Sequence, residues 1–155
     1  MTTTEMLPLT DLYERDETAW LEIMSELSAQ GRVAEMDLNN LSEFLGSMAK
    51  RDRREVNSRL VVLLTHLLKW ECQPQNRSGS WQATILEQRR QLRFDLTSGT
   101  LRAHALDTLA EAYVDARKQA AVEIGLPRTT FPALCPWSVD DLLADDDESE
   151  TEKPA

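Results

Sequence analysis

Apolar residues recur along this chain three and four positions apart, the spacing that places them on one face of a helix. The first such stripe is Ala19–Leu27. Asp16 stands where a carboxylate can cap a first helical turn, and Gly31 stands where a left-handed residue can end a helix. We therefore expect a helix over 16–30, preceded by a flexible arm over 1–10.

A second stripe begins at Leu38, after the candidate cap Asp37, and continues with helical spacing into the apolar segment that follows. Gly46 and the charged residues after it favour an interruption. We therefore expect one helix over 37–49 and another over 50–71, with one long kinked helix as the alternative.

The segment 60–70, LVVLLTHLLKW, is apolar on nearly every side, so other helices must cover it. Breaks at glycine, serine and proline divide the rest of the chain into further helices over 80–96, 101–124 and 139–143. No segment alternates as a strand does. The pattern predicts an all-α protein, a compact bundle of five to six helices around a central apolar helix.

The chain has 155 residues, enough for one domain, which we expect to be a single helical domain over 11–143. Residues 144–155 carry too few apolar groups to fold, which predicts a disordered acidic C-terminal tail. The longest apolar run is far shorter than the ~20 residues that span a bilayer. With two cysteines and no signal peptide, we expect a cytoplasmic protein that has reduced thiols and does not contact a membrane.

The net charge of −10 is unevenly distributed: −8 over 1–49, +5 over 50–118 and −7 over 119–155. A basic middle can bind a polyanion, or it can pair with the acidic ends within the fold. We favour pairing, because nucleic-acid-binding domains usually have a pI above about 9. The candidate basic patch consists of Lys50, Arg51, Arg53, Arg54, Arg90 and Arg93.

Several short sequences occur in a definite order along the chain. They are Leu12–Tyr13, Trp20–Leu21, Asn40–Leu41, HLLKW at His66–Trp70, Ser80–Trp81, EQRR at Glu87–Arg90, AYVDAR at Ala112–Arg117, and GLP, FP and CPW between Gly125 and Trp137. In this order, over 11–143, the chain resembles the bacterial domain-of-unknown-function family twenty-nine. The resemblance implies a small, soluble, helical bacterial protein and implies no activity.

The matching positions include large rings and charges on three helices, which can gather around His66. The candidate polar cluster consists of Arg59, His66, Lys69, Trp70, Trp81, Glu87, Arg89, Tyr113, Asp115 and Arg117. The cluster can be a site in which His66 is an acid–base group. It can equally be a network of ion pairs that fixes helix register, which we consider the better interpretation.

The sequence has no phosphate-binding glycine loop and no zinc or calcium motif, and neither histidine follows a Glu at the spacing of di-iron bundles. We expect no cofactor and no metal, and we lean against an enzyme. The first hypothesis is a protein–protein interaction module that binds a protein partner or itself, because the Met- and Leu-rich stripes exceed what one core can bury. The alternatives are a nucleic-acid-binding module that uses the basic patch, and an enzyme or ligand binder with a polar site around His66.

Overall fold

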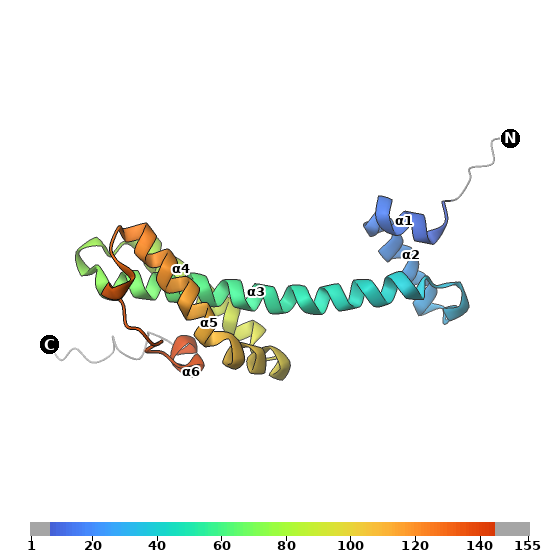
Figure 1. Ribbon diagram of the computed structural model, residues 1–155. Helices are drawn as coiled ribbons and strands as arrows, with labels where there is room; N and C mark the ends of the chain where they lie inside the picture. The colour runs from blue at the N-terminus through green and yellow to red at the C-terminus, as the bar shows by residue number, and fades with distance from the viewer. Residues whose placement is uncertain (1–6, 145–155) are drawn as a thin grey trace. The chain divides into compact units, whose positions relative to one another are not determined.

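The computed structural model describes residues 7–144, and the chain divides into two compact units, Met1–Lys50 and Arg51–Ala155. Every regular element in the described part is helical (Figure 1), which confirms the all-α prediction. The α-helices are α1 (Leu9–Arg15), α2 (Glu17–Ala29), α3 (Leu38–Cys72), α4 (Gly79–Asp95), α5 (Gly99–Ile124) and α6 (Val139–Leu143). Single 3-10 turns are η1 (Val33–Glu35), η2 (Pro74–Asn76) and η3 (Arg128–Thr130).

We call these two parts the N-terminal unit and the C-terminal unit. That they form the single domain expected over 11–143 stays a prediction. The first six residues of the expected arm, and the expected acidic tail after Ala144, lie outside the described residues.

The expected arm is shorter than predicted, because α1 begins at Leu9. The Pro8 carbonyl accepts the first backbone hydrogen bonds of α1, from the N–H groups of Asp11 and Leu12, each at 3.0 Å. No side chain of α1 is buried. A helix of two turns without a buried face leaves too short a stripe for periodicity to reveal, which is why the sequence pattern missed it.

Helix α2 begins and ends as predicted. The Asp16 carboxylate accepts the Ala19 N–H at 3.0 Å, and Gly31, at φ +67°, follows the last turn. The buried face of α2 consists of Trp20, Met24 and Leu27. The Trp20 ring lies 4.7 Å from that of Tyr13 on α1 and 5.9 Å from that of Phe44 on α3, which joins the three helices of the N-terminal unit.

Helix α3 runs unbroken for 35 residues, so the two separate helices predicted over 37–49 and 50–71 are wrong. Gly46 costs only about 1 kcal/mol in a helix, which is too little to end one that packing anchors. The charged residues after it are strong helix formers, and Glu55 pairs with Arg59 one turn on.

The C-terminal unit is the predicted bundle, built around the apolar segment 60–70 of α3. The most deeply buried side chains of that segment are Leu60, Leu63, Leu64 and Leu68. Helix α4 adds Ile85 and Leu92, and α5 adds small residues that let helices approach closely: Ala105, Ala112, Ala116 and Ala120. The cap of α4 is Ser78, whose hydroxyl accepts the Trp81 N–H at 3.2 Å, and the predicted cap Ser80 lies inside the helix.

Helix α6 has the predicted bounds. Ser138 and Asp141 form a capping box, in which each side chain accepts the other residue's backbone N–H. Val139 and Leu142 are buried in the core of the C-terminal unit. This short helix is therefore part of the bundle, although five residues are too few to form a stable helix alone.

Candidate functional site

The structure brings part of the candidate polar cluster together around Lys69. The Lys69 side chain is only 9% exposed; its Nζ lies 2.7 Å from Oε2 of Glu123 on α5 and 4.9 Å from the centre of the Trp81 ring on α4. A buried ammonium needs an anion or a ring face to offset its lost hydration, and Lys69 has both. One side chain thus joins three helices.

Glu123 was missed in the sequence analysis. Burial alone would raise the pKa of its carboxyl, but the hydrogen bonds from Lys69 and Gln119, with the charges of Lys69 and His66, outweigh burial and lower the pKa. A lysine on an otherwise apolar helix does imply a carboxylate partner. The sequence does not identify which carboxylate it is.

His66 is tied to its own helix rather than presented to a substrate. Its Nδ1–H donates to the Val62 carbonyl, one turn earlier, at 2.8 Å, and the ring is half-buried. His66 also helps to lower the pKa of the Glu123 carboxyl. His66 therefore lies at the edge of the Lys69 contacts.

Arg89 and Arg93 lie on α4 and bind the C-terminal end of α6. The Nε–H of Arg89 donates to the Leu142 carbonyl at 3.1 Å, and that of Arg93 donates to the Leu143 carbonyl at 2.7 Å. The last carbonyls of a helix lack partners within it, so cations there complete its hydrogen bonds and stabilise its dipole. The sequence analysis had placed Arg89 in the polar cluster and Arg93 in the basic patch.

Tyr113 and Arg117 fasten the segment that follows α5. The buried Tyr113 hydroxyl donates to the Pro132 carbonyl at 2.6 Å. The Arg117 guanidinium donates to the carbonyls of Arg128, at 3.0 Å, and Phe131, at 3.3 Å. Both side chains are thus engaged with backbone, away from His66.

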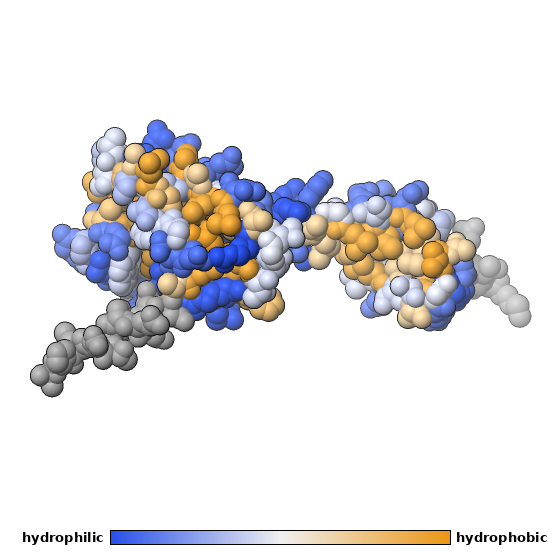
Figure 2. Space-filling model, turned by 90° about the horizontal axis from the view of Figure 1, so that it is seen from below, coloured by the Kyte–Doolittle hydropathy of each residue, from blue (hydrophilic) through white to orange (hydrophobic). Residues whose placement is uncertain are grey.

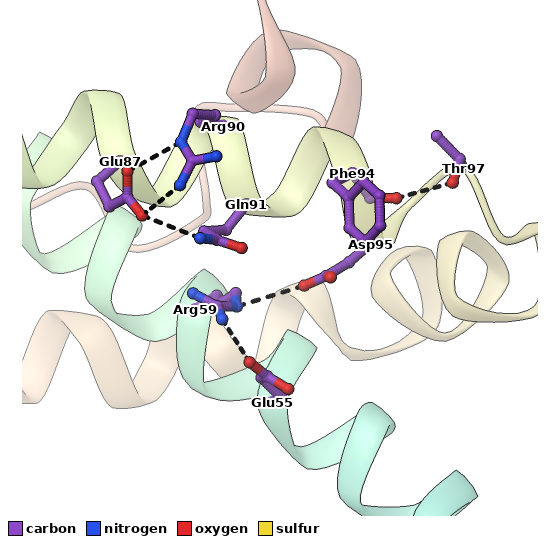
Figure 3. Close-up of polar contacts among 8 residues, drawn as sticks. All are labelled: Glu55, Arg59, Glu87, Arg90, Gln91, Phe94, Asp95 and Thr97. Carbon is purple, nitrogen blue, oxygen red and sulfur yellow. Dashed lines mark hydrogen bonds and ion pairs between the residues drawn. The ribbon is translucent and has the colours of Figure 1, made fainter.

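Arg59 and Glu87 belong to two further groups of contacts (Figure 3). Arg59 lies between Glu55 and Asp95, with its Nε 3.3 Å from an Asp95 carboxylate oxygen. Glu87 accepts from Arg90 at 2.9 and 3.0 Å and from Gln91 at 2.9 Å, which lowers the pKa of its carboxyl to about 2. Glu87 and Arg90 are exposed on α4, whereas Arg59 and Asp95 are half-buried where α3 and α4 meet.

The pKa of the Asp95 carboxyl is raised, in contrast to that of Glu87. Burial is the main cause that raises the pKa of its carboxyl, and the charges of Glu55 and Asp52 add to it, while Arg59 opposes it. Its position close to two other carboxylates gives this side of the bundle a negative field that a single arginine offsets only in part.

The remaining members of the polar cluster lie apart from Lys69. The Trp70 ring has the Arg77 guanidinium 4.8 Å above it, and Arg77 also donates to the Trp70 carbonyl at 2.8 Å. Asp115 is exposed on α5, on the rim of a shallow depression. That the cluster fixes helix register, rather than forming a site, stays a prediction.

The candidate basic patch is also divided. Lys50, Arg51 and Arg54 are exposed on α3, and Arg53 is half-buried. Arg90 pairs with Glu87, which offsets its charge, and Arg93 donates to a carbonyl of α6, so both are engaged in contacts within the C-terminal unit.

Within residues 7–144, no group of three or more His, Cys, Asp or Glu side chains is arranged to hold a metal ion. In the same part of the chain, no helix has the length and apolar character needed to cross a membrane. Cys72 and Cys135 are free thiols, and burial raises the pKa of each. A raised pKa keeps a thiol protonated and unreactive at neutral pH.

A surface that no sequence motif marked lies on the N-terminal unit. Val33, Leu38 and Leu45 are each more than half exposed. Beside them lies an open groove of about 550 Å³, whose apolar lining is Pro8, Leu9, Val33, Ala34, Met36 and Leu38. Figure 2 shows apolar residues gathered on the visible face of this unit, at the right of the view. We call Val33, Leu38, Leu45 and this groove the N-terminal face.

The comparisons with known proteins agree with the sequence resemblance. The family model described as "Domain of unknown function DUF29" matches residues 12–147. Neither the curated proteins nor the solved structures include a significant match. The chain therefore belongs to the DUF29 family, a domain of unknown function.

Proposed function

We propose that the protein is a protein–protein interaction module whose N-terminal face is the interface. The observation that carries the proposal is the apolar surface that the N-terminal unit leaves in water. Leu38 is 52% exposed and Leu45 is 59% exposed, seven residues apart on one helix. Among residues 7–50, the buried side chains are three residues of α2.

Such a surface favours association on energetic grounds. Burying one leucine contributes roughly 1.5–3 kcal/mol, and contiguous exposed apolar patches mark interaction sites. A unit of about 50 residues buries a smaller fraction of its own surface than a larger domain does. A partner that covers the N-terminal face would supply the burial that the unit lacks.

Charge indicates what kind of partner fits. Residues 1–49 carry a net charge of −8. Partial burial, and the nearby charges of Glu43, Glu17 and Asp37, raise the pKa of Tyr13, so the field around this side chain is negative. The partner we expect is a protein with an apolar helix bordered by basic residues, because opposite charges steer and align such contacts.

A photo-crosslinking amino acid placed at Leu45, in the cell that makes the protein, tests this proposal. The matched control carries it at Gln82, which is exposed on α4. We expect one protein to be captured reproducibly at position 45 and not at position 82. That protein, once purified, should bind the full chain in calorimetry, and Leu38→Glu should weaken binding at least about tenfold.

Two results would contradict the proposal. Equal and low capture at both positions, or a captured protein whose binding is unaffected by Leu38→Glu, would remove the N-terminal face as an interface.

A further inference from the structure

A second uncovered apolar surface lies in the C-terminal unit, at the end of α5. Val122 is 83% exposed there, and Leu126 is 38% exposed. Both border an open groove of about 670 Å³, which we call the α5 groove. Its lining consists of Lys118, Ala121, Val122, Gly125, Leu126 and Arg128.

The α5 groove combines an apolar floor with positive charge. Lys118 and Arg128 are exposed at its edge, and neither forms an ion pair with another residue in the described part of the chain. Its lining contains no carboxylate. Asp115 and Glu123 lie on the other side of Val122, where Glu123 is already paired with Lys69. The groove therefore selects a surface that is both apolar and acidic.

The chain itself carries a surface of that chemistry. We infer that the N-terminal face of one copy docks in the α5 groove of a second copy, an inference that rests on the proposed function. The charges are opposite, −8 over 1–49 against the cations Lys118 and Arg128 at the edge of the groove. The lengths also agree, because Leu38 to Leu45 rises about 10 Å along α3, and Lys118 to Ile124, the last residue of α5, rises about 9 Å.

Charge also decides the symmetry of the contact. Two N-terminal faces placed against each other would oppose −8 to −8, whereas the head-to-tail contact places Lys118 and Arg128 against the acidic N-terminal unit. A head-to-tail contact uses a different surface on each copy, so every assembly keeps one free N-terminal face and one free α5 groove until it closes into a ring. Association should therefore continue past the dimer as concentration rises.

Sedimentation of the full chain tests the association itself. At about 0.15 M salt, where the repulsion between whole chains of net charge −10 is screened beyond roughly 8 Å, the average mass should rise above the 17.6 kDa of one chain as concentration increases. It should fall back toward one chain at about 1 M salt. A mass that stays at 17.6 kDa at every concentration would overturn the inference.

Two variants, mixed, test which surfaces meet. Leu45→Glu disables the N-terminal face, and Val122→Glu disables the α5 groove; both positions are exposed, so both variants should fold, which circular dichroism verifies. Each should be a monomer alone, and their equimolar mixture should form a dimer. Phe94→Glu, at a site 76% exposed on α4, is the matched control and should associate as the native chain does.

Other results distinguish this inference from the proposed function. Dimers of Val122→Glu alone would mean that N-terminal faces pair with each other, and a mixture that stays monomeric would mean that the two surfaces do not meet. If Leu45 captures a different protein and the chain does not self-associate, the proposed function stands and the head-to-tail contact is wrong.

Discussion

At the scale of single residues, the buried Trp20 indole is satisfied by a partner that is distant in sequence. Trp20 donates from its indole nitrogen to the Asp37 carboxylate at 3.2 Å, and Asp37 also accepts from the Asn40 side chain at 2.7 Å. Asp37 thus serves both the start of α3 and the buried ring of α2. Asp37 should therefore contribute more to stability than a residue that only caps a helix.

We expect Asp37→Ala to destabilise the N-terminal unit by about 1–3 kcal/mol, because the buried Trp20 N–H loses its acceptor and α3 loses its cap. Hydrogen exchange of the α2 amides in the full chain measures the change. The matched control is Asp16→Ala, which removes a cap without an indole bond and should cost about 1 kcal/mol. Equal losses in the two variants would show that the indole bond contributes nothing.

The Lys69–Glu123 pair gives a pH dependence with a definite sign. The pKa of Glu123 is lowered in the folded protein, so its contribution is present above the unfolded pKa, about 4.3, and is lost as pH falls toward the folded pKa. Glu123→Gln should therefore be less stable than the native chain at pH 7, by roughly 1 kcal/mol after allowance for solvent screening. The difference should shrink below about pH 4.

Urea denaturation at pH 7 and below about pH 4 measures the difference in stability between Glu123→Gln and the native chain. The control is Glu22→Gln, at an exposed position on α2. If Glu123→Gln responds to pH as the control does, the ion pair does not stabilise the fold.

The same pair shows what could be predicted at this scale. Lys69, His66 and Trp81 could be grouped in advance because they share the central helix or face it. Glu123 could not, because the partner depends on how far along α3 the α5 helix crosses. That crossing is set by packing of small residues such as Ala116, and no single residue in the sequence encodes it.

At the scale of elements, α3 continues through Gly46, a residue that disfavours helix. Gly46 lies in the helix at ordinary negative φ, and a Cβ built on it would meet no atom within 4 Å. The predicted break therefore failed because propensity is weak compared with the packing that anchors the rest of the helix.

We expect Gly46→Ala to stabilise the protein by up to about 1 kcal/mol, because alanine has less freedom to lose on folding and nothing obstructs its methyl group. Gly125→Ala is the matched control. Gly125 sits at φ +69°, so the same substitution there should destabilise by a similar amount or more. Urea midpoints measure both, and a loss of stability in Gly46→Ala would mean that α3 needs a glycine at that point.

Helix α6 is a short element that side chains of α4 hold in place. We expect Arg93→Gln to loosen it, because the Leu143 carbonyl loses a charged donor, at a cost of about 1.5–3 kcal/mol for a full hydrogen bond to a charged group. Hydrogen exchange over 138–144 should be faster in this variant. Arg90→Gln, which removes an exposed pair on α4 alone, should leave that exchange unchanged.

At the scale of the whole molecule, the two units differ in how much core each holds. In the part of the chain that the structure describes, the C-terminal unit buries side chains from α3, α4, α5 and α6, whereas the N-terminal unit buries three. We expect the α2 amides to exchange at least about tenfold faster than those of the buried part of α5, because opening free energy follows local burial. Equal protection would mean that the units unfold together, as the predicted single domain over 11–143 requires.

The sequence was sufficient for the fold class and for most helices, because periodicity and caps such as Asp16, Ser138 and Gly125 act locally. The division into two units was not predicted. The division depends on which part of α3 is covered by other helices. The helical spacing of apolar residues in α3 is the same before and after Lys50, so the sequence does not reveal that point. Leu38 and Leu60 both follow helical spacing, yet one is 52% exposed and the other is 1% exposed.

The attachment of α6 has a consequence for synthesis. Arg89 leaves the ribosome more than 50 residues before the Leu142 carbonyl that it binds, and chains emerge at about 5–20 residues per second. The C-terminal unit therefore completes its core only after Leu143 has been synthesised. Truncations before Ala144 should thus impair folding of the nascent protein, because Arg89 and Arg93 would lack the carbonyls that they bind.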